Sequence, residues 1–322
     1  FLIMTEGNKT LKVLEIETVT GAVQADQMGI TDAHNHVWIS KISGASAGVP
    51  YFDDEQSILA ELKDYRKAGG NSILDCQPGK DCGRDGIRLL NFSKQSGVKI
   101  VASTGFHRRQ YYATDEWLFS ADEQTASDFF ISEIEHGLEE TCFLPNPVKA
   151  GFIKIACEEN LKDTPEHLLV AAAETCRKTG KAIEVHTEKG NAAVEIIDYF
   201  IKHKVNANRL ILCHMDKRPD FSLHRELIQA GALLEYDTFF RQKYEPEKYL
   251  WRLIEQMVSA GFSNNLAFAT DMADPLMWKR IGNGPGLVIF PTIIKQRLLS
   301  MDVSHLEVDR LLGSNVINRL LN

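Results

Sequence analysis

Short apolar runs alternate along the chain with segments whose apolar residues recur at helical spacing. Eight of the runs are almost continuously apolar, which is typical of parallel β-strands that are covered on both faces. They span residues 29–37, 71–77, 98–104, 151–157, 182–186, 210–214, 232–236 and 266–270. The pattern therefore predicts about eight strand–helix units in succession.

Helix boundaries can be read between several of these runs. Asp54 precedes an apolar stripe at helical spacing that ends before Gly69, which predicts a capped helix between the two. Thr164 and Pro165 offer an N-cap and a first-turn proline to a helix that Gly180 ends. Further helices are expected over residues 249–260 and 289–299.

Eight strand–helix units without a Pro/Gly-rich linker favour one α/β domain, a single (β/α)8 TIM barrel, in this chain of 322 residues. An open, doubly wound sheet is the structural alternative. The first residues lie outside the repeat, and their apolar positions, among them Ile16 and Val19, predict a short β hairpin. We therefore expect an N-terminal extension with a hairpin packed on the barrel over residues 1–25, and the barrel itself over residues 26–322.

Composition places the chain among ordinary globular proteins, with 44% hydrophobic and 25% charged residues. No apolar stretch approaches the roughly 20 residues of a membrane helix, and a net charge of −8 argues against a general nucleic-acid binder. The six Cys have no CxxC or disulfide-framework spacing, and no basic segment marks a secretory signal near Phe1. We therefore expect a cytoplasmic protein that binds neither nucleic acid nor membrane and takes a small-molecule partner.

Potential metal ligands stand at the ends of the predicted strands. They are His34 and His36 at the end of the first strand, Lys154 on the fourth, His186 on the fifth, His214 on the sixth and Asp271 just after the eighth. Residues two apart on a strand share a face, so both imidazoles of the first strand can reach one ion. Because a barrel gathers its chemistry at the C-terminal ends of many strands, this distribution favours the barrel over the open sheet and predicts a metal site there.

Each of these residues has a simpler interpretation when it is taken alone. Two histidines two residues apart often lie on the surface. Lys154, flanked by Phe152 and Ile155, would ordinarily snorkel or pair with an acid, because burying a lone ammonium is costly. However, four of the ten histidines occupy strand ends. Their joint occurrence with Lys154 and Asp271 favours the metal site.

Several short motifs accompany these ligands in a specific order. They are Gly-Arg-Asp at 83–85, Ser-Thr-Gly at 103–105, Phe-Ile-Lys-Ile at 152–155, His-Thr-Glu-Lys-Gly at 186–190, His-Met-Asp at 214–216 and Thr-Asp at 270–271. With them the chain, over residues 18–321, resembles the phosphotriesterase-like group of the amidohydrolase superfamily. The resemblance implies a (β/α)8 barrel with two divalent metals that are bridged by a carbamylated lysine and a hydroxide. It also makes Gly-Arg-Asp a structural motif of the barrel.

The resemblance assigns a role to each ligand. His34, His36 and Asp271 would hold the more buried ion, His186 and His214 the more exposed one, and Lys154, as a carbamate formed with CO2, would bridge both. Burial lowers the pKa of a lysine, and a neutral amine can take up CO2, which agrees with this role. Imidazole and carboxylate accept Zn, Mn, Co and Ni alike, with zinc the main expectation.

The implied chemistry is metal-dependent hydrolysis of an ester bond. The bridging hydroxide would attack the ester carbonyl, and Asp271 would accept its proton and deliver it to the leaving group. Cys76, Cys157 and Cys213 lie in predicted strands, but no Cys–His signature supports covalent catalysis by a cysteine. Asp271 and Lys154 are therefore the expected catalytic residues.

Residues that follow the strands are candidates for substrate binding. They are His107, Arg109 and Tyr112 after the third strand, Lys217 after the sixth, Arg241, Lys243 and Tyr244 after the seventh, and Trp278 after the eighth. Cations here would recognise a carboxylate or a phosphate, or they would pair with Asp216, Asp220 and Asp274. Relatives of this family hydrolyse sugar lactones, some of them phosphorylated, so the expected substrate is a small polar or anionic lactone.

Two alternatives stay open for the function. One is phosphotriester hydrolysis at the same metal centre, although Thr238 stands where some phosphotriesterases have a histidine. The other is a non-catalytic, small-molecule-binding barrel, which would have no reason to keep all six ligand positions. Phosphate recognition is itself in question, because Asp274 follows the eighth strand where phosphorylated-sugar lactonases have a basic and aromatic set. Members of the family are often dimers, so a homodimer is a further open expectation.

Overall fold

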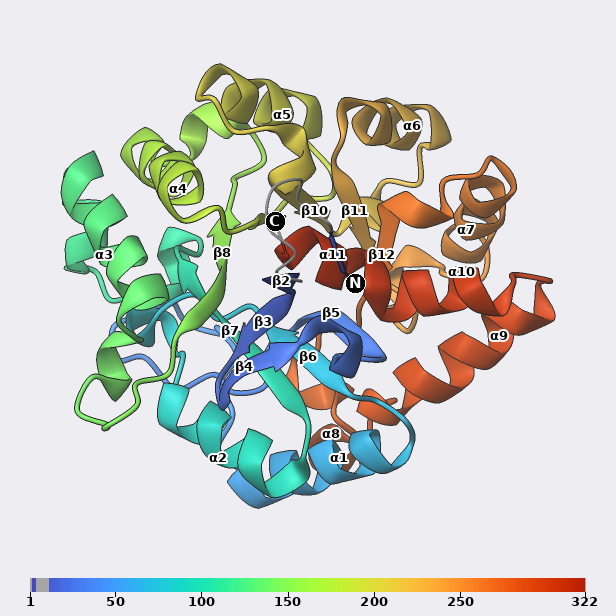
Figure 1. Cartoon of the computed structure of the whole chain (residues 1–322), viewed down its shortest axis with the longest axis horizontal. Coiled ribbons are helices and arrows are strands. Elements are labelled where there is room, and N and C mark those ends of the chain that lie inside the picture. Colours follow the sequence, from blue (N-terminus) through green and yellow to red (C-terminus); the bar gives the residue numbers. More distant parts are fainter. Residues whose placement is uncertain (1, 4–11, 322) are drawn as a thin grey trace.

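Eight parallel strands form the centre of the computed structural model, which describes residues 2–3 and 12–321 (Figure 1). They are β5 (Thr31–Asn35), β6 (Ser72–Asp75), β7 (Lys99–Gly105), β8 (Ala150–Ala156), β9 (Ile183–His186), β10 (Leu210–Cys213), β11 (Leu233–Tyr236) and β12 (Leu266–Phe268). Each strand pairs with the next one along the chain. The predicted (β/α)8 barrel is confirmed, and all eight predicted strands are found.

The residues that follow the last strand of this sheet meet the first strand. The backbone N–H of Asp271 donates to the carbonyl of His34 at 3.0 Å. The N–H of Thr270 donates to the carboxylate of Asp32 at 3.1 Å. These bonds nearly close the barrel, and they bring two of the predicted metal ligands, His34 and Asp271, side by side.

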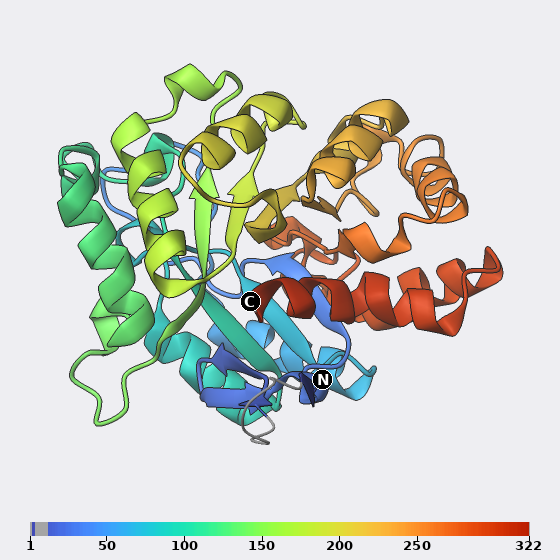
Figure 2. The ribbon, with the colours of Figure 1, turned by 45° about the horizontal axis from the view of Figure 1, so that its top comes forward.

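Helices surround the strands on all sides (Figures 1 and 2). They are α1 (Glu55–Lys67), α2 (Gly86–Ser96), α3 (Glu123–Glu135), α4 (Glu166–Thr179), α5 (Ala193–Lys202), α6 (Phe221–Ala230), α7 (Leu250–Ser259), α8 (Lys279–Gly282), α9 (Lys295–Ser300), α10 (His305–Asp309) and α11 (Asn315–Leu320). Asp54 caps α1 as expected, since its carboxylate accepts from the N–H of Ser57 at 2.9 Å. In the part of the chain that the structure describes, no helix is both long and apolar enough to cross a bilayer.

Two predicted helix starts differ from the structure. Thr164 does not cap α4, because the helix begins one residue later with Pro165 at its N-cap, and the Thr164 hydroxyl accepts from the N–H of Glu158 at 2.9 Å instead. The helix expected from residue 289 begins as a π-helical turn, Phe290–Ile294, and becomes α-helical only at Lys295. Pro291 lies in that turn and has no N–H to donate, which favours the irregular start.

The predicted N-terminal hairpin is formed by β3 (Glu15–Thr18) and β4 (Gly21–Gln24). Ile16 is buried among residues of the barrel interior such as Val101 and Phe152. The hairpin, in blue in Figures 1 and 2, therefore covers the N-terminal end of the strands, where α11 also packs. A second pair, β1 (Leu2–Ile3) and β2 (Lys12–Val13), precedes it.

The Gly-Arg-Asp motif has the structural role that was expected. The Arg84 side chain is fully buried and pairs with Glu133 and with Glu140, the latter at 2.8 Å. Asp85 caps α2 by accepting from the N–H of Arg88 at 2.9 Å. The motif thus links α2 to α3 and to the loop that follows α3, and it lies outside the candidate site.

Of the apolar run at residues 1–4, only Leu2 and Ile3 are among the described residues.

Candidate metal centre

Three of the predicted ligands form one group at the C-terminal end of the barrel. The Nε2 atoms of His34 and His36 lie 3.7 and 3.8 Å from Oδ1 of Asp271. All three side chains are buried, and their ligand atoms are close enough together to hold one ion. The structure thus brings together the three residues assigned to the more buried metal.

The other two histidines lie directly beside this group. Nδ1 of His186 is 2.9 Å from Nε2 of His214. The ring centroids of His34 and His214 are 4.9 Å apart, so the two pairs of histidines are neighbours. His214 follows β10 with a left-handed backbone, φ 64°, which turns its side chain out of the strand direction at this point.

Every histidine of the centre has an acceptor on one of its two ring nitrogens. The partners are Glu235 for His34 (2.8 Å), Gln77 for His36 (2.7 Å), Glu188 for His186 (3.0 Å) and Asp237 for His214. Metal-binding histidines almost always donate their second N–H to such an acceptor, which fixes the ring and the tautomer. The donor set and these partners together fit a pair of divalent ions.

The protonation of most of these rings also suits metal binding. Burial lowers the pKa of His36 to about 3 and that of His186 to about 4. Burial likewise holds the pKa of His214 well below its ordinary value, so these three rings are neutral and can donate a lone pair. The pKa of His34 is raised well above its ordinary value: burial opposes the rise, and Cys76 and Glu235 produce it.

Lys154 points into the barrel interior in this structure. Its Nζ lies 3.0 Å from Oε1 of Glu184 and 3.4 Å from Sγ of Cys213. Burial alone would lower the pKa of this lysine, but Cys213 and Glu184 raise it well above its ordinary value. The expectation that desolvation alone leaves a neutral amine is therefore wrong, because the buried acid next to Lys154 stabilises its ammonium form.

Four residues below the histidines were not predicted as part of the site. The interior cluster, as we name it, consists of Cys76, Glu184, Cys213 and Glu235, all of which are fully buried. Glu184 and Glu235 interrupt strands that are otherwise apolar, and Glu184 lies two residues before His186 on the same face of β9. A charged residue inside an apolar strand, which is the signal that singled out Lys154, could have identified both.

Asp271 is held as an anion. Burial would raise its pKa, but Arg241, His214 and His34 hold it well below the ordinary range. Arg241 donates to Oδ2 of Asp271 at 2.7 Å, which leaves Oδ1 facing the histidines. The carboxylate is thereby oriented with one oxygen toward the metal ligands and the other toward the mouth of the barrel.

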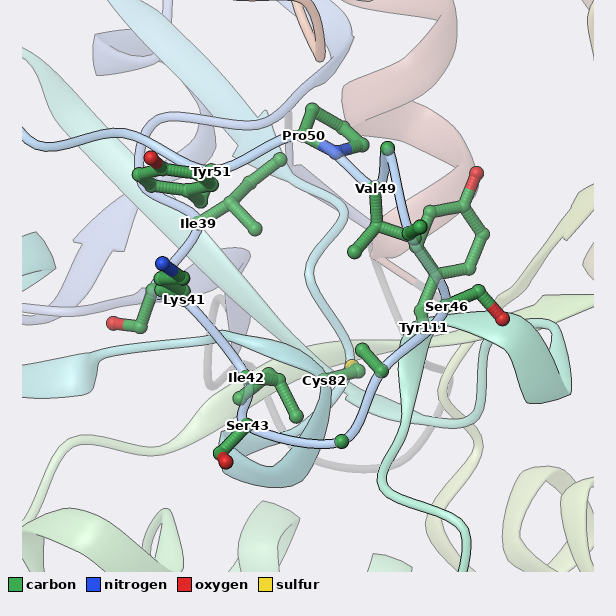
Figure 3. A pocket seen from close by; sticks show the side chains of 15 residues that line it. Ile39, Lys41, Ile42, Ser43, Ser46, Val49, Pro50, Tyr51, Cys82 and Tyr111 are labelled. Carbon is green, nitrogen blue, oxygen red and sulfur yellow. The ribbon is translucent and has the colours of Figure 1, made fainter.

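An open pocket of about 560 Å³ adjoins Asp271 and Arg241. Its other walls are residues 48–51 from the loop after β5, Asp53, and residues 273–275 after β12. A second pocket of about 350 Å³ lies under the same loop (Figure 3). There Lys41 lies against the ring of Tyr51, with Nζ 5.2 Å from its centroid, Tyr111 lies across the pocket from them, and Cys82 lies between the two sides. Both pockets share residues 48–51, so this loop separates them.

Several candidate substrate-binding residues surround the centre. Lys217 lies 3.9 Å from Oδ1 of Asp237 and 5.9 Å from the ring centroid of Tyr244. Lys243 is exposed and lies 5.1 Å from the same centroid. Among the described residues no salt bridge joins these cations to Asp216, Asp220 or Asp274, although burial raises the pKa of Asp216 and Lys217 opposes this rise at longer range. Those three carboxylates accept backbone N–H groups instead.

The loop after β7 contributes unevenly to the site. The ring of His107 is buried 5.5 Å from that of His186 and 6.5 Å from that of His36, and the Tyr112 hydroxyl accepts from the N–H of His107 at 2.9 Å. Arg109 donates instead to the carbonyl of Ala113 at 2.6 Å. His107 thus reaches the metal centre, whereas Arg109 stabilises its own loop.

Trp278 also lies away from the metal ligands. It is fully buried, its indole N–H donates to the carbonyl of Met272 at 2.8 Å, and its ring packs edge-on against Phe52 at 5.4 Å. These contacts hold the loop after β12 against the loop after β5. The structure therefore gives Trp278 packing contacts and no opening toward the pocket beside Asp271.

Comparison with known proteins agrees with this geometry. The model of the Phosphotriesterase family matches residues 14–319. A phospho-furanose lactonase from Mycoplasmopsis synoviae is 28% identical over 286 residues, 85% of this chain and 80% of the relative. One from Mycoplasmopsis agalactiae is 31% identical over 248 residues, 73% of this chain and 69% of the relative.

The fold is also similar to a solved structure. The crystal structure of a lactonase from Listeria monocytogenes superposes with a TM-score of 0.86 over 96% of this chain and 99% of that one, at 24% identity. At this level of sequence identity, the comparison shows a similarity of fold only. The family match covers nearly all of the barrel, including every residue of the candidate metal centre. The chain therefore belongs to the phosphotriesterase family and is a metal-dependent hydrolase.

Proposed function

We propose that this protein is a binuclear metal-dependent lactonase that opens the ester bond of a small polar or anionic lactone. One observation carries the proposal: four histidines and Asp271 converge, and each imidazole is oriented by an acceptor on one ring nitrogen, which leaves the other nitrogen available to a metal. His34, His36 and Asp271 would hold one ion, and His186 and His214 the other. When bound, two such ions would polarise an ester carbonyl and lower the pKa of water.

Asp271 would move the proton in this reaction. Its Oδ1 faces the metal ligands, and Oδ2 is held by Arg241 at 2.7 Å. An anionic carboxylate in this position can accept a proton from water during attack on the ester and return it to the alkoxide that leaves. Arg241 would keep the carboxylate ionised and correctly oriented before the proton arrives.

Lys154 would bridge the two ions as a carbamate. Its Nζ lies 3.5 Å from Nδ1 of His34, on the side of the ring opposite Asp271, so the end of the side chain would have to turn past this ring to face the other ligands. The ammonium must first lose a proton and leave Glu184. Its conversion to a carbamate changes the charge at this position from positive to negative, which suits a site that holds two dications.

The surroundings of the centre support a substrate with an anionic group on one side. Lys217 and Tyr244 lie on the β10 and β11 side, whereas Asp53 and Asp274 line the pocket beside Asp271. Asp53 and Asp274 would repel a carboxylate or phosphate from the second side, where Arg241 is already paired with Asp271. Lys217 would attract such a group instead. Relatives named phospho-furanose lactonase support a sugar lactone, and the acidic side argues that any phosphate is held by Lys217 rather than near Asp274.

Phosphotriester hydrolysis fits less well as the main activity. Thr238 has its hydroxyl engaged by Asp216 at 2.6 Å, so it does not offer a group for proton relay. The surroundings are charged, whereas a neutral triester would favour an apolar pocket. The same centre would still support it as a weak side activity, because both reactions develop negative charge on an oxygen next to a metal.

A panel of lactones tests the proposal directly. Protein reconstituted with zinc or manganese and bicarbonate would be given neutral, carboxylated and phosphorylated sugar lactones, with proton release followed by a pH indicator. We expect at least one lactone to turn over with kcat/KM above about 10⁴ M⁻¹s⁻¹, the lower end of ordinary enzyme efficiency. If all lactones are inert while two metals are bound per chain, the substrate class is wrong and phosphoesters and amides come next.

A further inference from the structure

The interior cluster lies directly beneath the proposed binuclear centre. Oε1 of Glu184 is 2.9 Å from Sγ of Cys76 and 3.3 Å from Sγ of Cys213. Oε2 of Glu235 is 2.8 Å from Nδ1 of His34, the nitrogen opposite the one that faces Asp271. Ligand atoms of His34, Glu184, Cys213 and Glu235 all lie within 4.8 Å of one another. Two carboxylates and a thiol are thus arranged around one small volume.

The cluster has donor atoms without partners. Oε2 of Glu184 is buried and accepts no hydrogen bond, although the residue is completely inaccessible to solvent. Oε1 of Glu235 also lacks a donor, and Glu235 contacts the carboxylate of Asp237, so these two acids need a proton or a cation between them. A buried polar atom without a partner is costly and indicates a missing ligand or proton. Two groups next to these residues can carry a positive charge in this structure: the ammonium of Lys154, 3.0 Å from Glu184, and the ring of His34, whose Nδ1 lies 3.1 Å from Glu184 and 2.8 Å from Glu235.

The ammonium is lost if Lys154 becomes a bridging carbamate. Glu184 would then lose the ammonium that now helps to balance its charge in a fully buried environment, and binding of a metal through Nε2 would leave the second neighbour, His34, as a neutral ring. An uncompensated buried carboxylate must gain either a proton or a new cation. Cys213, which also contacts the Lys154 ammonium at 3.4 Å, would lose the same partner.

We propose that the interior cluster is a third cation site, filled by a thiophilic divalent ion when Lys154 leaves it. Glu184, Glu235 and Cys213 would be the protein ligands, with Cys76 beside them. The part of the inference that concerns Lys154 rests on the carbamate proposed above. Metal binding would convert the Cys213 thiol to a thiolate, and the proton that the thiol loses would pass to solvent.

The donor set selects the kind of ion. Thiolate is a soft ligand that favours zinc, cobalt(II) or iron(II), whereas magnesium and calcium prefer sites made only of oxygen. The proposed binuclear centre contains imidazoles, a carboxylate and a carbamate but no sulfur. Sulfur ligation therefore distinguishes the interior cluster from the binuclear centre in any spectroscopic measurement that detects metal–thiolate bonds.

Cobalt(II) reconstitution of the whole protein tests the proposal. In the presence of bicarbonate we expect three cobalt ions per chain, with a near-ultraviolet absorption band from thiolate-to-cobalt charge transfer. Cys213→Ser should abolish the band and lower the count from three ions to two. The control is Cys157→Ser, because Cys157 is equally buried but lies outside the cluster, and it should keep both the band and the third ion.

Lys154→Ala separates this proposal from the proposed function. The variant removes both the ammonium and the carbamate, so the binuclear centre should lose at least one ion while the thiolate band remains. A wild-type protein that binds two cobalt ions without a thiolate band overturns the third site, whatever its activity on lactones. The third site is also overturned if the band survives Cys213→Ser, or if Lys154→Ala eliminates the band in a folded protein.

Discussion

Two adjacent layers inside the same barrel have opposite chemistry. On β8, Phe152 and Lys154 lie two residues apart and face the same side; on β11 the same holds for Leu233 and Glu235. The layer nearer the N-terminal ends is apolar and is covered by the hairpin and α11. The layer above it is made of acids, thiols and a lysine. Along each strand, only two residues separate the apolar layer from the polar layer.

The contrast shows what each layer depends on. In the lower layer, side chains are stabilised by burial itself, so their contribution follows the apolar area removed from water. In the upper layer burial is costly, and each charged group is stable only with a specific partner. A substitution in the upper layer should therefore be harmful when it removes the partner of a charged group. A substitution in the lower layer should change stability in proportion to the side-chain volume that it removes.

The largest effect of a substitution is expected for Asp271, at the polar C-terminal end of the barrel. Asp271→Asn keeps the shape of the side chain but removes the carboxylate that we assign to proton transfer. The catalytic constant should fall by about 10²- to 10⁴-fold, the usual contribution of general acid–base catalysis. Steady-state kinetics on the best lactone would measure this, with circular dichroism to verify the fold. A fall below tenfold would contradict the role of Asp271.

A change in the apolar layer should act on stability instead. Phe152→Ala removes a completely buried ring and should lower the free energy of unfolding by about 3–5 kcal/mol. Phe143→Ala is the matched control, because Phe143 is 76% exposed, and it should change the free energy by no more than about 0.5 kcal/mol. Chemical denaturation would measure both. Equal effects of the two variants would refute the assignment of Phe152 to the core.

Loss of an orienting acceptor should weaken metal binding by an intermediate amount. Asp237→Asn replaces the carboxylate that faces Nδ1 of His214. It should reduce the affinity for the zinc ion held by His186 and His214 by about 10- to 100-fold. Competition with a chelator would measure the affinity. Glu255→Gln, on the exposed face of α7, serves as the control. Unchanged affinity in Asp237→Asn would show that His214 is oriented by other contacts.

The smallest effect concerns substrate selection. Lys217→Met should raise KM for an anionic lactone about tenfold, as expected from loss of one charged hydrogen bond, and leave a neutral lactone unaffected. Lys243→Met should have a weaker effect, because Lys243 is exposed. Arg109→Ala should leave this selectivity unchanged, since its guanidinium contacts its own loop. Parallel KM shifts for neutral and anionic lactones would remove Lys217 from substrate recognition.

The strands and the positions of the ligands could be predicted from the sequence for one physical reason. Parallel strands in a barrel share a direction, so His34, His186 and His214 at strand ends must converge at one edge. The resemblance to the phosphotriesterase family rests on these positions, and the family is confirmed. The boundary at residue 25, the cytoplasmic location, the homodimer and the absence of a nucleic-acid partner stay predictions.

Side-chain direction and long-range pairing could not be predicted in the same way. Arg109 and Trp278 occur in the correct loops, yet one turns to carbonyls of its own loop and the other packs into the core. The pKa of Lys154 depends on Glu184, which is 30 residues away in sequence but 3.0 Å away in space. Such partners are set by strand register across the barrel, which a single sequence does not encode locally.

Anomalous diffraction from crystals of the zinc-loaded protein tests the central claim most directly, because it locates each ion relative to the two layers. We predict one ion about 2.0–2.1 Å from Nε2 of His34 and Nε2 of His36, and a second at the same range from Nδ1 of His186 and Nε2 of His214. Asp271 should contact the first ion. Zinc bound to the opposite ring nitrogens, or a single ion in this region, would contradict the account.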